Sequence, residues 1–354
     1  HFRLNFYSVP FAASLMFTTL GLWLWLKATP ERHPGRREHV HVGSWSVAGA
    51  QPLSLRHLAA GAACIAANFG CRPTFALSAL LCFPIFWPQI TSLLQGLKSR
   101  SLPPRRALRA PAAVIIPALI VVLPLMAYNV ARFGSPLDFG NDYQMTVTDM
   151  TRFVQPTANF LPSVGAYLFL PLRFTSEFPF IGMTPMAFRE WGYYEPMAGG
   201  LFTACPLLLL ALAAPFLRRR MHRSGYWGLA TCSLALAVLL ASFDSHTAGL
   251  GWRYICDFGW MMAIAALAPM LYLMHPGGNA IAAGAPDPSE RNEPRRDVTK
   301  RHPMALACVR GLVVAVLMAS IILAVLACFI PGRDDSLINN NPVLYDTVVA
   351  WFRL

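Results

Sequence analysis

Charged residues are scarce in this chain of 354 residues, since they make up 13% of it, against roughly 25% in an ordinary soluble globular protein. Hydrophobic residues supply 55%, and the mean hydropathy is +0.46. Apolar runs of about 20 residues recur, which is the length that an α-helix needs to cross about 30 Å of hydrocarbon. The composition therefore excludes an ordinary soluble enzyme and predicts an integral membrane protein.

The chain also lacks the short motifs that mark several common enzyme classes. It contains no Gly-rich phosphate loop, no HExxH zinc motif and no GxSxG nucleophile turn. Its 8 cysteines are scattered, mostly in apolar segments, without CxxC spacing. We therefore expect thiols buried within helices, and we predict no metal site, no disulfide framework and no cofactor.

Acidic residues are few as well, which leaves a net charge of +12. Most of the basic excess lies in four short segments between apolar stretches, the positive-inside pattern of a membrane protein. This distribution argues against a nucleic-acid partner, whose site would need a continuous basic patch. It also orients the chain, with these four segments in the cytoplasm.

About eight apolar stretches alternate in agreement with that orientation. A transmembrane β-barrel would instead show strands of about 10 residues with alternating polarity. The sequence therefore predicts an all-α, polytopic membrane helix bundle that forms a single integral domain over residues 1–354. The predicted crossings are Phe6–Leu26, Leu55–Phe69, Thr74–Leu94, Pro111–Ala127, Leu201–Leu217, Trp227–Ser242, Phe258–Met274 and Ala305–Phe329.

Three segments outside these stretches have distinct expected roles. Residues 128–199 form a long extracytoplasmic segment, in which Ala158–Leu172 is a short interfacial or re-entrant helix. Residues 275–303 are polar and form a mobile cytoplasmic loop. Val343–Phe352, in the extracytoplasmic tail, forms a short amphipathic helix. We expect a multi-pass protein of a bacterial inner membrane.

Arg72 is the first candidate for chemistry, because ionisable residues within membrane segments are costly and often functional. It lies where Gly70 and Pro73 end a helix. A guanidinium there can hold a phosphate through two hydrogen bonds. The alternative is a structural arginine that extends toward the membrane surface.

The stretch Tyr128–Asp149 combines aromatic residues, turn signals and carboxylates. Asp138 and Asp142 are candidates for a general base or for ligands of a divalent cation beside a phosphate. The alternative is that they are solvated aspartates that form turns. Three neighbours are expected to line the same site: Arg132, Asn141 and Tyr143.

A third candidate group surrounds Arg253, at the start of a predicted crossing. Arg253 and Asp257 are four residues apart and can simply pair on one helix face, or Arg253 can face a substrate phosphate while Asp257 orients it. His246 is expected to be an ordinary loop histidine. The aromatic cluster Trp191, Tyr193 and Tyr194 is expected to be an interfacial belt, with sugar stacking as the alternative.

Several of these blocks resemble bacterial GT-C glycosyltransferases, the protein-mannosyltransferase-like membrane enzymes that use polyprenyl-phosphate sugars. The resemblance covers about two thirds of the chain, and its motifs are moderately specific for that group. It is carried by Tyr128-Asn129 with Arg132 to Gly140 and Tyr143-Gln144, by Cys71 to Thr74, by Tyr194 to Met197 with Gly200, and by Arg253-Tyr254 with Asp257-Phe258.

The resemblance implies a hexosyl- or pentosyltransferase that moves a sugar from a polyprenyl phosphate to an extracytoplasmic acceptor. It adds Glu195 and Tyr254 to the expected substrate site. In this family the catalytic acid or base usually lies in the first outer loop, and the predicted orientation places that loop before residue 1. The chain is therefore expected to be N-terminally truncated. A transporter or flippase of a lipid-linked saccharide and a non-catalytic membrane subunit are the alternatives.

Overall fold

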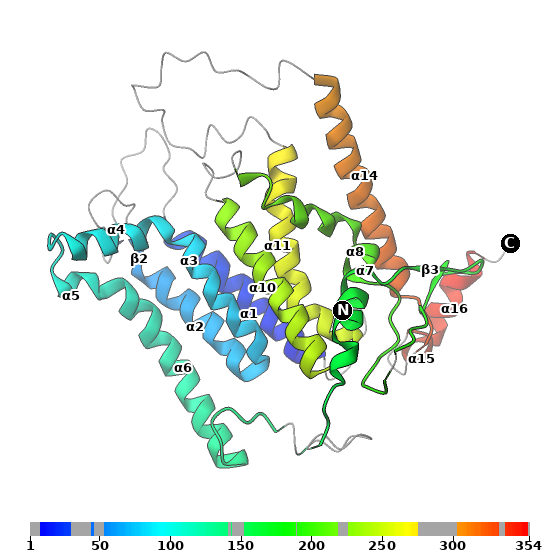
Figure 1. The fold of residues 1–354 in the computed structure, drawn as a ribbon, viewed down its shortest axis with the longest axis horizontal. Coiled ribbons are helices and arrows are strands. Elements are labelled where there is room, and N and C mark those ends of the chain that lie inside the picture. Colours follow the sequence, from blue (N-terminus) through cyan, green and yellow to red (C-terminus); the bar gives the residue numbers. More distant parts are fainter. Residues whose placement is uncertain are drawn as a thin grey trace. The chain divides into compact units, whose positions relative to one another are not determined.

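The structure is a computed structural model, and it describes residues 8–29, 44–45, 53–140, 143, 152–188, 190–218, 226–274, 303–332 and 337–352. The chain divides into two compact units (Figure 1). The N-terminal unit is Phe6–Phe153, and the C-terminal unit is Val154–Leu354 together with His1–Asn5. Each unit is built mainly from helices.

The core of the N-terminal unit is a layer of three long helices. Helix α2 (Leu55–Cys71) packs against both α1 (Ser8–Ala28) and α6 (Arg109–Phe133). Small residues allow α1 and α2 to approach closely, and the indole nitrogen of Trp25 donates a 3.2 Å hydrogen bond to the carbonyl of Leu58. A two-residue antiparallel pair, β1 (Ser44–Trp45) with β2 (Leu53–Ser54), precedes α2.

The predicted crossing Thr74–Leu94 is not one straight helix, because this stretch is broken. It starts as a 3₁₀ helix, η1 (Pro73–Leu81), and continues as α3 (Cys82–Ile85) and α4 (Trp87–Lys98). The two halves meet at an angle of 65°. Pro84 and Pro88 lack the amide hydrogens that a continuous α-helix needs, which explains the break. A one-turn helix, α5 (Pro104–Ala107), then leads into α6.

The C-terminal unit is organised around an antiparallel pair of long helices, α10 (Tyr226–Thr247) and α11 (Ile255–Met274) (Figure 1). Helix α7 (Phe160–Phe169) packs against α10. The 3₁₀ helix η4 (Pro206–Ala213) packs against α11 and α14 (Pro303–Ala327). The other elements are η3 (Thr157–Asn159), α7 (Phe160–Phe169), β3 (Arg173–Phe174), β4 (Ile181–Gly182), α8 (Leu201–Ala204), η4 (Pro206–Ala213), η6 (Trp252–Tyr254), α14 (Pro303–Ala327), α15 (Leu337–Asn340) and α16 (Pro342–Ala350).

Within the described residues, five helices are long and apolar enough to cross a membrane, or six if the bent stretch Pro73–Lys98 counts as one span. They mark the chain as a multi-pass, all-α membrane protein, but the predicted number of about eight crossings is wrong. Helix α2, which contains the predicted crossing Leu55–Phe69, has 17 residues and is not one of these five helices. The predicted crossing Leu201–Leu217 is interrupted at Cys205, whose non-helical backbone (φ −136°, ψ 78°) precedes Pro206.

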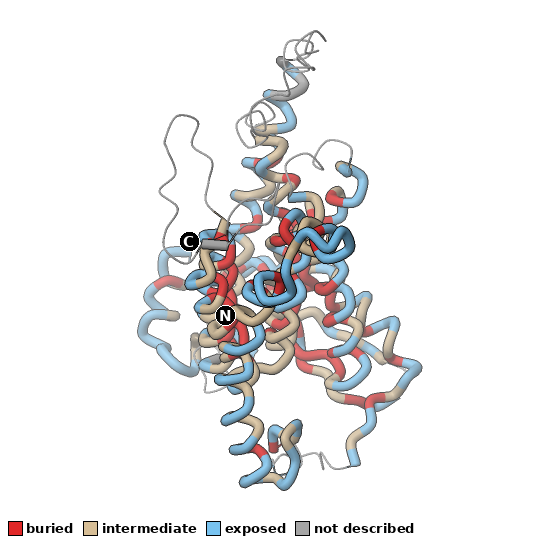
Figure 2. The backbone as a smooth tube through the Cα atoms, turned by 90° about the vertical axis from the view of Figure 1, so that its left-hand side faces the viewer, coloured by how far each residue is buried: buried red, intermediate tan, exposed pale blue. Residues whose placement is uncertain are grey.

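Burial follows this membrane character. Along the long helices, buried residues (red in Figure 2) alternate with exposed ones (pale blue). Few residues of helices α6 and α14 are buried, although nearly all their side chains are apolar. In water such surfaces would be unfavourable, whereas lipid tails cover them without cost.

Two predicted loops are partly helical. Helix α6 continues to Phe133, so Tyr128 and Arg132 lie on its last turns, and Gly134 ends it in the left-handed conformation (φ 79°). Helix α10 continues to Thr247 and so includes His246. The predicted cytoplasmic loop at 275–303 lies almost wholly outside the described residues.

Candidate functional site

The predicted site residues fall into both units, and those of the C-terminal unit form the denser cluster. There, the chain around Tyr194 runs beside the α10–α11 connection. The amide of Leu250 donates to the carbonyl of Tyr193 at 3.0 Å, and the amide of Glu195 donates to the carbonyl of Leu250 at 2.8 Å. This short parallel bridge brings Glu195 close to η6, where Arg253 lies, directly before α11.

Glycine is required at the connection. Gly249 has φ +85°, a conformation that other residues rarely adopt. A side chain there would also collide with the carbonyl of Tyr193 and approach the side chain of Gln155. Gln155 is itself buried and accepts a 3.2 Å hydrogen bond from the amide of Tyr193. The two strands of the bridge are therefore fixed by both backbone and side-chain contacts.

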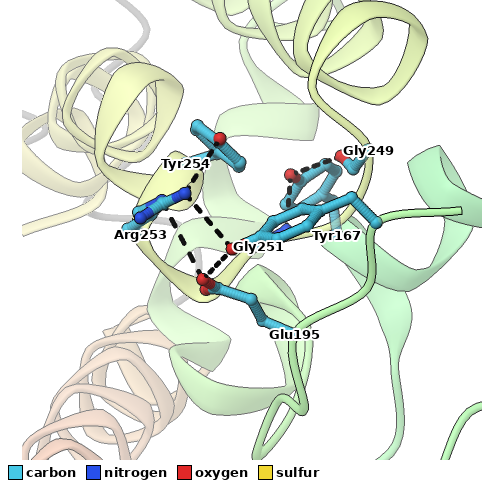
Figure 3. Close-up of polar contacts among 7 residues, drawn as sticks. Tyr167, Glu195, Gly249, Gly251, Arg253 and Tyr254 are labelled. Carbon is cyan, nitrogen blue, oxygen red and sulfur yellow. Dashed lines mark hydrogen bonds and ion pairs between the residues drawn. The ribbon is translucent and has the colours of Figure 1, made fainter. Parts of the chain in front are cut away.

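Tyr167 of α7 holds the same connection from the other side (Figure 3). Its hydroxyl donates to the carbonyl of Gly249 at 2.8 Å and accepts from the amide of Gly251 at 3.0 Å. The ring is fully buried and lies edge-on to Phe258 of α11, with centroids 5.4 Å apart. The sequence placed Tyr167 in an apolar stretch and gave it no role. A lone tyrosine in such a stretch is a usable signal, because a buried hydroxyl needs a partner.

The guanidinium of Arg253 is held by three side chains (Figure 3). Its Nε lies 3.9 Å from Oε1 of Glu195. Its Nη2 donates hydrogen bonds to the hydroxyls of Tyr193 at 3.2 Å and Tyr254 at 3.3 Å. The hydroxyl of Tyr193 in turn donates to the carboxylate of Glu195. The side chain of Glu195 is 6% exposed and that of Arg253 is 26% exposed. A nearly buried carboxylate thus orients a partly accessible cation.

This environment also affects Tyr193. Burial raises the pKa of its hydroxyl above the ordinary value, and the hydrogen bond to the Glu195 carboxylate raises it further. Tyr193 therefore keeps its proton and works as a donor to Glu195. Sequence reasoning expected Tyr193 and Tyr194 in an interfacial belt. The structure bonds Tyr194 to Gln155 and Asn159 and leaves Trp191 76% exposed, and the belt stays a prediction.

Asp257 is fully buried in the first turn of α11. The guanidinium of Arg253 lies 3.9 Å from the carboxylate of Glu195, a contact that the four-residue spacing of Arg253 and Asp257 does not reveal. Arg253 lies in η6 and Asp257 in α11, and the predicted pairing of the two stays a prediction. His246 lies in the last turn of α10 and contacts the ring of Phe160 edge-on.

In the N-terminal unit, Arg72 lies at the break between α2 and η1, as predicted. Its guanidinium carbon is 4.1 Å from the centre of the Phe11 ring, a cation–π contact. Arg72 has an extended backbone (φ −149°, ψ 105°), and its amide donates to the carbonyl of Asn68 at 2.8 Å. These contacts fit a structural arginine, and its phosphate-binding role stays a prediction.

The end of α6 holds a second group. Arg132 donates to the hydroxyl of Tyr128 at 3.1 Å, and its guanidinium lies over the ring of Phe133. The ring of Tyr143 stacks on the same Phe133 ring, with centroids 5.3 Å apart. Tyr143 is 65% exposed. Oδ1 of Asp138 accepts a 2.7 Å hydrogen bond from the amide of Gly140.

Asp138 therefore forms a turn, as expected if it is a solvated turn residue. Its role as a catalytic base stays a prediction. Asn141 and Asp142 lie outside the described residues. Within the described ranges, no group of three or more His, Cys, Asp or Glu side chains is arranged to hold a metal ion.

Comparison of the chain with protein-family models, with curated proteins and with solved structures gives no match. The site must therefore be interpreted from its own chemistry. The most developed arrangement is the Arg253 cluster, which comprises Tyr193, Glu195, Arg253 and Tyr254.

Proposed function

We propose that this chain is a membrane glycosyltransferase that moves a sugar from a polyprenyl-phosphate donor to an acceptor on the extracytoplasmic side of a bacterial inner membrane. The observation that carries the proposal is the Arg253 cluster. Arg253 lies in η6, directly before the membrane helix α11, is held by Glu195 and two tyrosines, and keeps 26% of its side chain exposed.

The chemistry of such a transfer needs a fixed cation. When the bond between the sugar and the phosphate oxygen breaks, the phosphate leaves with additional negative charge. A guanidinium that is already oriented stabilises this charge without reorganisation. Glu195 and Tyr193 supply the orientation, so they are positioning residues, while Arg253 is the residue that contacts the phosphate. Arg72, in the N-terminal unit, is the alternative candidate for the residue that binds the phosphate.

The proposal is tested by measuring sugar transfer from a radiolabelled polyprenyl-phosphate sugar in membranes that contain the protein. Hydrogen bonds from a charged group contribute roughly 1.5–3 kcal/mol, so Arg253→Ala should lower transfer by about 10- to 100-fold. Arg173→Ala, which removes an exposed arginine from the same unit, is the matched control and should transfer normally. Glu195→Gln should raise the apparent KM for the donor more than it lowers kcat.

Equal transfer by the wild type, Arg253→Ala and Arg173→Ala at equal protein levels would rule out this assignment. The absence of transfer from every polyprenyl-phosphate sugar tested, with wild-type membranes, would count against the reaction class itself.

The second candidate is a transporter or flippase for a lipid-linked saccharide. One observation favours it: each unit contains an apolar stretch in which proline starts a 3₁₀ helix, η1 after Arg72 and η4 after Cys205. Interrupted apolar helices in both halves of a chain are typical of secondary transporters. Movement of a fluorescent lipid-linked saccharide across vesicles, without any change in its glycan, would favour this function over transfer.

A further inference from the structure

Helix α16 (Pro342–Ala350) follows the last membrane helix and is too short to cross a bilayer, since 9 residues span about 14 Å. Its start is well defined. Pro342 occupies the first helical position, and the side chain of Asn341 accepts a 3.1 Å hydrogen bond from the amide of Leu344. The residues at its start therefore define where this helix of the C-terminal unit begins.

One face of α16 is packed against the protein. Val348 is buried, and Phe352, four residues further on, stacks on Phe178 with ring centroids 4.5 Å apart and planes 12° apart. Phe180 contacts the same ring of Phe352 edge-on. Both Phe178 and Phe180 lie in the connection between β3 and β4, so the hairpin holds this face of the helix.

A second face of this segment is exposed and largely apolar, with Thr347 as its polar member. Val343 and Trp351 are eight residues apart and so share a face, and they are 75% and 73% exposed. Leu344, beside them, is 46% exposed. Asp346 is the one charged residue between Leu337 and Phe352, and it lies at the edge between the two faces. A helix with two apolar faces needs an apolar partner on the second one.

The membrane interface is the partner that the structure favours. Phe178, which stacks on Phe352, also packs against Phe329 at 5.2 Å, directly after α14. Helix α14 is exposed along most of its length and is apolar enough to cross the membrane. The aromatic contacts therefore place α16 beside the end of a lipid-covered helix (Figure 1). Tryptophan favours this depth, where its ring is apolar on one side and hydrated on the other.

We propose that α16 lies in the plane of the membrane interface, with Val343, Leu344 and Trp351 inserted among the lipid headgroups and upper acyl chains. The surface is thus a lipid-binding one, which anchors the C-terminal end of the unit and is independent of the proposed transferase activity. Amphipathic helices of this kind bury their apolar face by about 5–10 Å.

The test uses the full chain in phosphatidylcholine nanodiscs with one copy per disc. In a variant without the 8 native cysteines, an environment-sensitive fluorophore is attached to Trp351→Cys or, as the matched control on the same helix, to Asp346→Cys. At position 351 we expect blue-shifted emission, strong quenching by lipids with a nitroxide near the headgroup, and weak quenching by iodide in water. At position 346 we expect stronger iodide quenching.

Equal quenching by iodide at both positions, without quenching by the lipid nitroxide, would overturn the proposal. Shielding of position 351 that appears only with two copies per disc would assign this face to a second copy of the chain instead. A second measurement keeps the native cysteines. Brominated lipids should remove a smaller share of the tryptophan emission from Trp351→Phe than from the wild type, and equal shares would contradict the proposal.

Discussion

Arg253 shows how a residue's partners decide what it can do. A membrane arginine that is only paired with a carboxylate is a structural feature, because both charges are satisfied. Arg253 contacts a nearly buried carboxylate and two tyrosine hydroxyls, and its side chain is still partly exposed. That combination fixes the direction of the guanidinium and leaves part of it accessible. Arg72, Arg132 and Arg253 all lie over aromatic rings, and Arg253 is in addition ion-paired with a nearly buried carboxylate.

Tyr167 offers a direct test of how the Arg253 cluster is held. Tyr167→Phe removes the hydroxyl that bonds Gly249 and Gly251 and leaves these backbone groups without that partner. We expect the free energy of unfolding to fall by about 1–3 kcal/mol. Thermal unfolding in detergent measures it, with Tyr226→Phe as the control because Tyr226 is 49% exposed. Equal melting temperatures for the two variants would show that the Tyr167 hydroxyl is not needed.

The raised pKa of Tyr193 predicts a dependence of stability on alkaline pH. The folded protein holds this proton more tightly than the unfolded chain does, chiefly because of burial and the Glu195 hydrogen bond. The resulting stability is fully present below the ordinary tyrosine pKa of about 10 and is lost as the pH rises above it toward the folded value. Between pH 9.5 and 11 the melting temperature of the wild type should therefore fall more steeply than that of Tyr193→Phe. Parallel curves would contradict this sign.

Among single residues, sequence reasoning identified Glu195, Arg253 and Tyr254 but not the contacts that join them. The link between Glu195 and Arg253 depends on a backbone bridge between segments far apart in the chain, and no local pattern reveals such a bridge. The spacing of Arg253 and Asp257 predicts a helical pair, which stays a prediction. Tyr193 was noticed for its aromatic ring, whereas the structure uses its hydroxyl.

At the scale of elements, long apolar runs without internal breaks were predicted well. Helices α1, α6, α10, α11 and α14 all appear close to the expected positions. The predicted crossings that are interrupted contain proline, but proline does not always interrupt a helix. Pro206 follows an interruption, whereas Pro117 and Pro124 lie within the continuous α6. In α6 the surrounding turns tolerate the missing amide hydrogens. Proline alone therefore does not reveal from sequence which apolar run is broken.

The packing of α1 on α2 gives a prediction for one element pair. A Cβ atom at Gly61 would lie 2.7 Å from Nε1 of Trp25 and 2.9 Å from the carbonyl oxygen of Gly21. Gly61→Ala should therefore separate the helices and lower the melting temperature in detergent. Gly311→Ala in α14 is the matched control, since nothing lies within 4 Å of that position, and it should be neutral or slightly stabilising. A neutral effect at Gly61 would mean that α1 and α2 do not approach this closely.

At the scale of the whole molecule, the membrane explains the exposed apolar helices, the scarcity of charge and the distribution of basic residues together. The Arg253 proposal and the α16 proposal both depend on this setting. The first needs a lipid-linked donor, and the second needs a lipid surface. The orientation came from sequence alone, through the positive-inside pattern, and it predicts that the chain after α6 faces the extracytoplasmic side.

Labelling on either side of α6 tests that orientation most directly. Leu137 and Arg105 are both exposed and lie beyond opposite ends of α6. In intact cells, with the native cysteines replaced, a membrane-impermeant maleimide should label Leu137→Cys and should label Arg105→Cys only after the membrane is opened. Labelling of Arg105→Cys but not Leu137→Cys in intact cells would reverse the orientation, and equal labelling of both would show that α6 does not cross the membrane.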